Sequence, residues 1–231
     1  MKNKPAADWY AFHFGSKFAE SPDFNPEGLF GHGGTPECYV LYADFCSFTS
    51  FFKATENTRC IEPLMTSFYS ELRKAIHERS GMLDKFLGDA VIAVWGLHVR
   101  ENDMIQAVLE TCNELAAIAN RVAEEWQSRI DLLVEPKGMR IGLSKGPIIV
   151  IRRDLHYPGL SILGNPINLA SRLQAAATAN QLVCSNLVYQ DAASARLHDR
   201  FQPYKGAAEA AYLEAKNYGA NKAWTMDLKP A

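Results

Sequence analysis

The chain has 231 residues, of which 48% are apolar and 22% charged, and 24 basic residues nearly balance 26 acidic ones for a net charge of −2. This size and composition are typical of one globular domain with a short appendage. The near-neutral net charge argues against a protein that binds nucleic acid or anionic lipid mainly through its overall charge. No apolar run approaches the ~20 residues of a membrane span, and the N-terminus lacks the apolar segment of a signal peptide, so we expect no membrane insertion.

The cysteines and histidines favour no metal or disulfide framework. Five cysteines are scattered without a C-x-x-C pair, and six histidines are scattered without an H-E-x-x-H pair. Such an odd set of separated thiols is typical of reduced core cysteines. We therefore expect a cytoplasmic protein.

Periodicity and turn residues predict an arm over residues 1–36 and a single domain over residues 37–231. Within the arm, Gly31–Gly34 breaks any regular pattern. The predicted elements of the domain, in chain order, are a strand 39–45, a helix 61–80, a hairpin of strands 82–86 and 91–95, a helix from Asn102 to 129, strands 139–143 and 148–152 joined by a tight Ser-Lys-Gly-Pro connection, a helix 165–177 capped by Asn165, a strand 182–184, a helix capped by Ser185, and strands 200–203 and 223–227. Hairpins mixed with helices predict an α+β sheet with helices on one face.

Two carboxylates are candidate metal ligands. Asp44 ends a buried strand and Asp89 lies at the tip of a predicted hairpin, so adjacent strands would bring them together. Paired carboxylates beside a flexible loop suit Mg²⁺ and leave coordination sites for phosphate. Taken alone, Asp89 is better interpreted as a turn residue.

A second pair lies on the helix predicted over residues 165–177. Asn168 and Arg172 are spaced i,i+4, so both side chains leave one face of the helix. An amide and a guanidinium together can hold a ribose and a phosphate. Arg172 alone would be an ordinary surface cation.

Four blocks of sequence, in this order, resemble the catalytic domain of class III nucleotidyl cyclases. The resemblance covers about residues 38–184, and any one block would be weak evidence alone. The blocks are YADFCSFT around Asp44, DKFLGDAVIAVWG around Asp89, MRIGLSKGP from Met139, and LGNPINLASRL around Asn168. The resemblance implies a ferredoxin-like fold of the βαββαβ type, in which helices pack on a mostly antiparallel sheet.

The resemblance also implies roles for matching residues. Asp44 and Asp89 match two aspartates that bind two divalent ions, Mg²⁺ or Mn²⁺. Lys85 matches a lysine that reads the base, and Asn168 and Arg172 match residues that orient the ribose and stabilise charge on the α-phosphate.

Further positions concern the triphosphate and the base. Arg140 and Lys205 fall where the family places cations near the β- and γ-phosphates, and Ser161 stands at the second base-reading position. The backbone amides of a strand-to-helix turn would cradle the triphosphate; the residues of this turn are Phe45, Cys46, Ser47, Phe48 and Thr49.

The implied reaction closes a nucleoside triphosphate into a 3′,5′-cyclic nucleotide. The ribose 3′-hydroxyl attacks the α-phosphorus and pyrophosphate leaves, so catalysis consists of positioning and charge stabilisation. In this family, the aspartates of one subunit face the lysine, asparagine and arginine of another. The resemblance therefore implies a homodimer with two shared sites.

The base is the least determined feature. Guanylate cyclases carry Glu where Lys85 stands, which argues against GTP. An ammonium group only donates, so Lys85 suits adenine N1 and equally uracil O4 or cytosine O2 and N3, while Ser161 can donate or accept. The family usually has glycine at the position of Ser47. The serine side chain would tighten the turn that holds the phosphates.

A catalytic domain with little else attached resembles the free-standing cyclases of Pycsar-type phage defence, which make cyclic UMP or cyclic CMP for a separate effector. On this associational ground we favour UTP or CTP, with ATP as the alternative.

Three other classes compete with this reading. A non-catalytic cyclase-fold module that dimerises or senses a nucleotide would normally lose one of the aspartates or Arg172. A diguanylate cyclase would carry Gly-Gly-Asp-Glu-Phe around Asp89. A serine hydrolase is suggested by G-x-S-x-G around Ser144, but Pro147 and a β-branched run follow instead of the required helix. Trp95 and the Phe51-Phe52 pair are expected in the core or at a dimer interface, with stacking on the base as the alternative.

Overall fold

The computed structural model describes residues 10–21, 35–97, 104–152, 160–205 and 222–229. Its elements in chain order are α2 (Ser16–Ala19), β1 (Glu37–Phe45), α3 (Phe48–Ala54), η2 (Thr58–Cys60), α4 (Ile61–Glu78), β2 (Met82–Leu87), β3 (Ala90–Trp95), α5 (Met104–Gln127), β4 (Met139–Pro147), β5 (Ile149–Arg152), β6 (Leu160–Leu163), α6 (Asn165–Ala176), β7 (Gln181–Ser185), α7 (Asn186–Ser194), η3 (His198–Arg200), β8 (Gln202–Pro203) and β9 (Ala223–Asp227).

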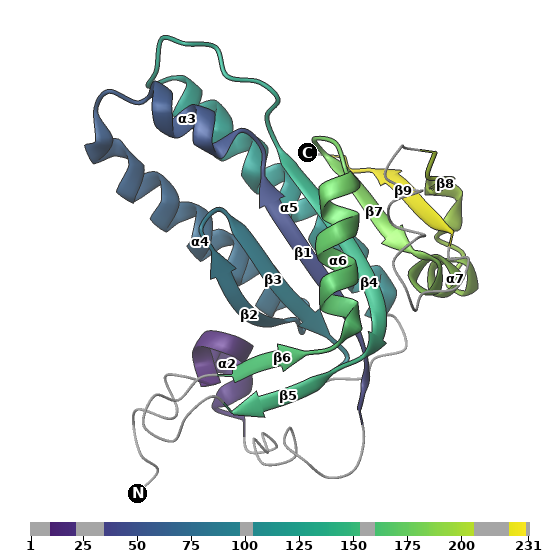
Figure 1. Ribbon diagram of the computed structural model, residues 1–231. Coiled ribbons are helices and arrows are strands. Elements are labelled where there is room, and N and C mark those ends of the chain that lie inside the picture. The colour runs from purple at the N-terminus through teal and green to yellow at the C-terminus, as the bar shows by residue number, and fades with distance from the viewer. Residues whose placement is uncertain (1–9, 22–34, 98–103, 153–159, 206–221, 230–231) are drawn as a thin grey trace, which may run out of the picture.

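A seven-stranded sheet in the order β2-β3-β1-β4-β7-β9-β8 organises the molecule (Figure 1). Every pair of neighbouring strands is antiparallel except β4 and β7. β5 and β6 form a separate two-stranded sheet. The observed architecture is the predicted α+β arrangement around a mostly antiparallel sheet.

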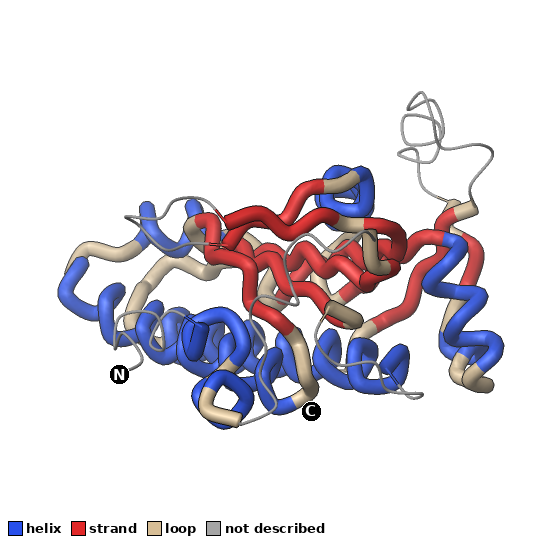
Figure 2. Tube along the Cα trace, turned by 90° about the horizontal axis from the view of Figure 1, so that it is seen from below, coloured by secondary structure: helices blue, strands red, loops and turns tan. Residues whose placement is uncertain are grey.

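Helices cover both faces of this sheet, so the prediction of helices on one face is wrong. In β1, Leu41 and Phe45 pack with α4 and α5 on one face, whereas Val40 packs with α6 and β5–β6 on the other. Figure 2 shows the strands between the two helical layers. The reason is the near-continuous apolar run of β1, which is typical of a strand buried on both sides.

β4 corrects the predicted hairpin of strands 139–143 and 148–152. It continues to Pro147 and pairs with β1 along its whole length, while β5 pairs with β6, which the sequence did not predict. Ser144 is buried inside β4, and its hydroxyl donates a 2.6 Å hydrogen bond to Pro166 O. The G-x-S-x-G match is therefore a strand that supports a helix, and Ser144 is not placed as a nucleophile.

Helices α6 and α7 begin near the predicted residues, but their capping contacts differ from the prediction. Gly164, and not Asn165, is the N-cap of α6, with Pro166 in its first turn. Ser185 is the N-cap of α7, as predicted, but its side chain makes no capping hydrogen bond. Asn102 lies outside the described residues. No helix in the described ranges is long and apolar enough to cross a bilayer.

The described part of the N-terminal arm, residues 10–21, packs on the domain. Phe14 is only 2% exposed and lies in the cluster that contains Met82 and Val94. His13 is buried, and its Nδ1 donates a 2.6 Å hydrogen bond to Leu83 O. This part of the arm contributes aromatic side chains to the fold.

Candidate active site

The two predicted aspartates come together at one end of β1. Asp44 stands opposite Ala90 in the β1–β3 ladder, so Asp89, one residue earlier, is its near neighbour. Burial raises the pKa of the Asp89 carboxyl, and the negative charge of Asp44 raises it further. The structure therefore places two mutually repelling carboxylates beside each other.

Arg140 neutralises one of them. It lies directly opposite Asp44 in the β1–β4 ladder, and its Nη2 forms an ion pair with Asp44 Oδ2. Gln174 of α6 is 7% exposed, and its Nε2 lies 3.4 Å from the same carboxylate oxygen. The family resemblance implies a place for Arg140 beside phosphates. Gln174 was not predicted; its signal is a polar side chain on the apolar face of α6.

A β-bulge in β2 places the Lys85 side chain on the face of the sheet that α6 covers. Leu83 pairs with Ala93 and Lys85 pairs with Ile92, so Asp84 is the extra residue. Without the bulge, alternation would turn Lys85 to the opposite face. The extra residue instead keeps Lys85 on the face of Ile92, which is the face that carries the cluster beneath α6.

The two predicted base-reading residues meet. Lys85 Nζ donates to Ser161 Oγ at 3.5 Å and lies 3.1 Å from Asp84 Oδ2. Asp84 is only 2% exposed, so its carboxylate is a fixed anchor for the ammonium group. β6 brings Ser161 to β2, which the predicted elements did not foresee.

The predicted phosphate cradle is shorter than expected. The amide of Cys46 donates to Gly138 O at 2.9 Å, so the prediction that it faces phosphate is wrong. Phe45 directs its ring into the core against Phe68. Ser47 is the N-cap of α3, and Phe48 and Thr49 begin that helix, where amides lack intrahelical acceptors.

Ser47 explains why glycine suits this turn. Its backbone is left-handed, with φ 58° and ψ 20°, a conformation that costs an L-residue about 1–2 kcal/mol. Its hydroxyl donates a 2.9 Å hydrogen bond to Pro136 O. Ser47 therefore adopts an unfavourable backbone conformation and gains one hydrogen bond to the loop before β4.

Asn168 and Arg172 lie together on the exposed side of α6, as their spacing predicts. The inward side of the helix is formed by other residues, among them Leu169, Leu173 and Gln174. The described contacts do not bring Asn168 or Arg172 to the aspartates of the same chain.

Lys205 also remains apart. It is exposed and follows β8, which β9, β7 and β4 separate from β1. Its neighbour Tyr204 donates a 3.0 Å hydrogen bond to Ala176 O at the end of α6.

Two of the three aromatic residues considered for base stacking lie in the core. Trp95 and Phe51 are fully buried, whereas Phe52 is half-exposed on α3. Stacking of Trp95 on a base is therefore excluded by its burial.

The carboxylate pair fits divalent metal ions. Asp44 and Asp89 supply the oxygen ligands that hard cations prefer, and a cation between them would relieve the repulsion that raises the pKa of Asp89. Within the described ranges, no group of three or more His, Cys, Asp or Glu side chains gathers as a metal site. Any further ligands would be water, phosphate or backbone oxygens.

Comparison with known proteins identifies the family. Residues 32–206 match the family described as the adenylate and guanylate cyclase catalytic domain. The chain belongs to this family. The resemblance recognised in the four sequence blocks is thereby confirmed, and so is the interpretation as a nucleotidyl cyclase domain.

Relatives and solved structures agree with this assignment. The chain is 29% identical over 160 residues to an uncharacterized protein of Mycobacterium tuberculosis and 24% identical over 193 residues to an adenylate cyclase of that organism, covering 69% and 82% of this chain. It spans only 35% and 39% of their lengths.

Two cyclase structures share the fold. The adenylyl cyclase CyaB from P. aeruginosa superposes with a TM-score of 0.64 at 20% identity, over 84% of this chain and 94% of that one. The guanylyl cyclase Cya2 superposes with a TM-score of 0.65 at 17% identity, over 85% and 94%. These likenesses confirm the predicted cyclase-type α+β fold.

Proposed function

We propose that the chain converts a nucleoside triphosphate into a 3′,5′-cyclic nucleotide and pyrophosphate. The observation that carries the proposal is the meeting of Asp44 and Asp89 beside the start of α3. On the same sheet, the Lys85–Ser161 pair offers polar contacts to a base. A fold used only to dimerise has no need of two adjacent carboxylates that repel each other.

Each residue then has a chemical task. Asp44 and Asp89 would hold two divalent ions, which supply positive charge beside the phosphates when bound. Asn168 orients the ribose, and Arg172 donates to the α-phosphate as charge develops on it. The amides of Ser47, Phe48 and Thr49 face the outer phosphates, with Arg140 as a nearby cation. Because the nucleophile and the phosphorus belong to one molecule, positioning supplies much of the rate.

A second copy of the chain would complete each site. Asn168 and Arg172 are exposed and leave α6 on a different side from the buried Gln174, the α6 residue that reaches Asp44. Three large apolar side chains, Ile149, Ile151 and Leu163, are exposed on one side of the β5–β6 sheet. Ser161 alternates with Leu163 on that same side. An apolar surface beside half a site favours a homodimer with shared sites.

The contacts of Lys85 favour a pyrimidine base. Lys85 donates to Ser161 Oγ, so the serine hydroxyl is left to donate its own proton, and the pair offers two donors. A pyrimidine carbonyl oxygen accepts from both, whereas the amino group of adenine requires an acceptor. We therefore favour UTP or CTP, with a separate effector in phage defence as the receiver of the product.

ATP is the alternative substrate. The adenylate cyclase relatives support it, and Ser161 retains a lone pair that can accept from an amino group. All five cysteines are free thiols, which agrees with a reducing, cytoplasmic site of action for either nucleotide.

A competition assay tests the reaction and the base together. Purified protein with Mn²⁺ or Mg²⁺ is given ATP, GTP, CTP and UTP in equal amounts, and cyclic products are identified by mass spectrometry. We expect cyclic UMP or cyclic CMP to predominate. Predominant cyclic AMP would overturn the choice of base, and no cyclic product from any nucleotide would overturn the reaction.

Mixing two inactive variants tests the shared site. Asp44→Ala and Arg172→Ala proteins are each expected to be inactive, and their mixture should regain activity because one site of a mixed dimer has both halves intact. The matched control mixes Asp44→Ala with Asp89→Ala, whose lesions lie in the same half, and should stay inactive. Equal inactivity of both mixtures, with subunit exchange demonstrated, would refute the arrangement.

A further inference from the structure

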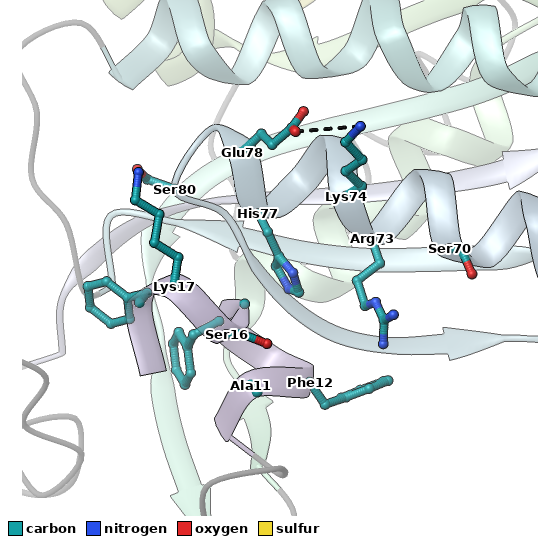
Figure 3. A pocket seen from close by; sticks show the side chains of 13 residues that line it. Ala11, Phe12, Ser16, Lys17, Ser70, Arg73, Lys74, His77, Glu78 and Ser80 are labelled. Atoms are coloured by element: carbon teal, nitrogen blue, oxygen red, sulfur yellow. Dashed lines mark ion pairs between the residues drawn. The ribbon is translucent and has the colours of Figure 1, made fainter. Parts of the chain in front are cut away.

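A cavity of about 910 Å³ lies where the N-terminal arm crosses α4 (Figure 3). It shares no residue with the candidate active site. Its size is within the range of small-molecule sites, which is roughly 300–1,000 Å³. The arm lines one side with aromatic and small residues, and α4 lines the other with polar and charged residues.

The walls of this cavity are held by specific contacts. His77 of α4 donates from Nε2 to His13 O at 3.2 Å, and His13 in turn bonds to β2. Gly15 has φ +81°, and a Cβ there would lie 3.2 Å from the His77 ring. The arm therefore turns closely onto α4 at a residue where side chains are disfavoured.

The charge of the cavity is positive. Lys17 and Arg73 line it, and neither has an ion-pair partner among the described residues, whereas Lys74 pairs with Glu78 at 3.8 Å. Figure 3 shows Arg73 and His77 pointing from α4 toward the arm. Burial lowers the pKa of His77 to about 4, so its imidazole is neutral near pH 7. Within the part of the chain that the structure describes, two cations without an ion-pair partner therefore line this space.

The remaining lining suits an aromatic body. Phe12 and Phe18 contribute partly exposed rings from the arm, while Phe14 is buried in the core, and Ser16, Ser70 and Ser80 contribute hydroxyl groups. Aromatic rings bind a flat ring by stacking, hydroxyls bind a sugar or water, and Arg and Lys bind phosphate or carboxylate.

We infer that this cavity binds a small aromatic anion of the size of a mononucleotide, at a site separate from the catalytic one. Arg73 and Lys17 supply positive charge to its anionic group from two ends of the cavity, and the rings of Phe12 and Phe18 contact its apolar body. The proposal does not depend on the cyclase reaction, because it concerns binding in the absence of metal ions.

Calorimetric titration in EDTA tests the proposal, with AMP and UMP as probes and adenosine and uridine as neutral counterparts. We expect both nucleotides to bind and the nucleosides to bind at least tenfold more weakly. Arg73→Ala and Lys17→Ala should each weaken nucleotide binding about tenfold, as the loss of one charge-assisted hydrogen bond implies. Ser70→Trp, an exposed position at the cavity wall, should block binding without disturbing the core.

Two controls make the outcome decisive. Lys222→Ala removes an exposed cation beside β9 and should leave binding unchanged, and Lys85→Ala should also leave it unchanged. If binding is lost in Lys85→Ala and kept in Arg73→Ala, the probe occupies the catalytic site and the proposal is wrong. Equal binding of nucleosides and nucleotides, or no binding of either nucleotide, would likewise overturn it.

Discussion

Gly142→Ala tests how α6 is positioned over the sheet. A Cβ on Gly142 would lie 2.0 Å from Ala170 O and 2.3 Å from the amide nitrogen of Gln174. Both neighbours are helix backbone, which cannot rotate away as a side chain can. The first contact is about 1.4 Å short of an ordinary 3.4 Å contact, so α6 must move away from β4 by about that distance.

The cost of this movement follows from close packing. Overpacking a buried contact typically costs about 1–3 kcal/mol, and a clash with backbone belongs at the upper end. We expect the free energy of unfolding to fall by about 2–3 kcal/mol. For a domain of this length, that corresponds to a decrease of roughly 4–12 °C in Tm. Because α6 carries Asn168 and Arg172, a displacement near 1 Å should also reduce cyclase activity by about 100-fold.

Gly146→Ala is the matched control. Its Cβ would lie 2.9 Å from Cγ of Pro166, which is a side-chain atom on the same helix. We expect a loss of only about 1 kcal/mol, since a small rearrangement suffices. Thermal and urea unfolding of both variants, with activity measured in parallel, decides the point. Equal stability of Gly142→Ala and wild type would refute the claim that α6 rests directly on Gly142.

Substitutions at three further positions probe the turn, the acidic pair and α4. Ser47→Gly should be at least as stable as wild type and about 1 kcal/mol more stable than Ser47→Ala in urea unfolding, because glycine accepts the left-handed backbone; equal variants would contradict this. Asp89 has a raised pKa, so wild-type stability falls as pH rises through the ordinary and then the raised value. Asp89→Asn should therefore be inactive yet more stable than wild type at pH 7, with the gain vanishing below about pH 3.8; a gain that is constant with pH would count against the repulsion. His77 has a pKa lowered from 6.5 to about 4, so stability is lost as pH falls through that window, and His77→Gln should flatten this slope in thermal unfolding.

The elements that the sequence predicted well are those whose pattern depends only on residues close together in the chain. The β2–β3 hairpin follows from two apolar runs around Gly88-Asp89, and α4 and α5 follow from their helical periodicity. The approach of Asp44 to Asp89 follows as well, because it needs only that β1 and β3 be neighbours.

The elements that sequence missed depend on contacts distant along the chain. β4 was divided because Gly146-Pro147 resembles a turn, whereas Gly142 and Gly146 in fact make room for α6. The bulge at Asp84 depends on the register of β2 against β3, which composition does not encode. α3 begins at the left-handed residue Ser47, which glycine would have signalled more clearly.

Arg140 connects the predicted site with the observed one. Two adjacent carboxylates without a countercharge would be unfavourable in a half-buried site, and Arg140 provides that charge from the strand opposite Asp44. We predict that this guanidinium leaves Asp44 and meets a phosphate when the carboxylate gains another cation. On this prediction, the observed contact with Asp44 and the expected place beside the phosphates are two positions of one side chain. The acidic pair can fold in a stable form because its countercharge is attached to the neighbouring strand.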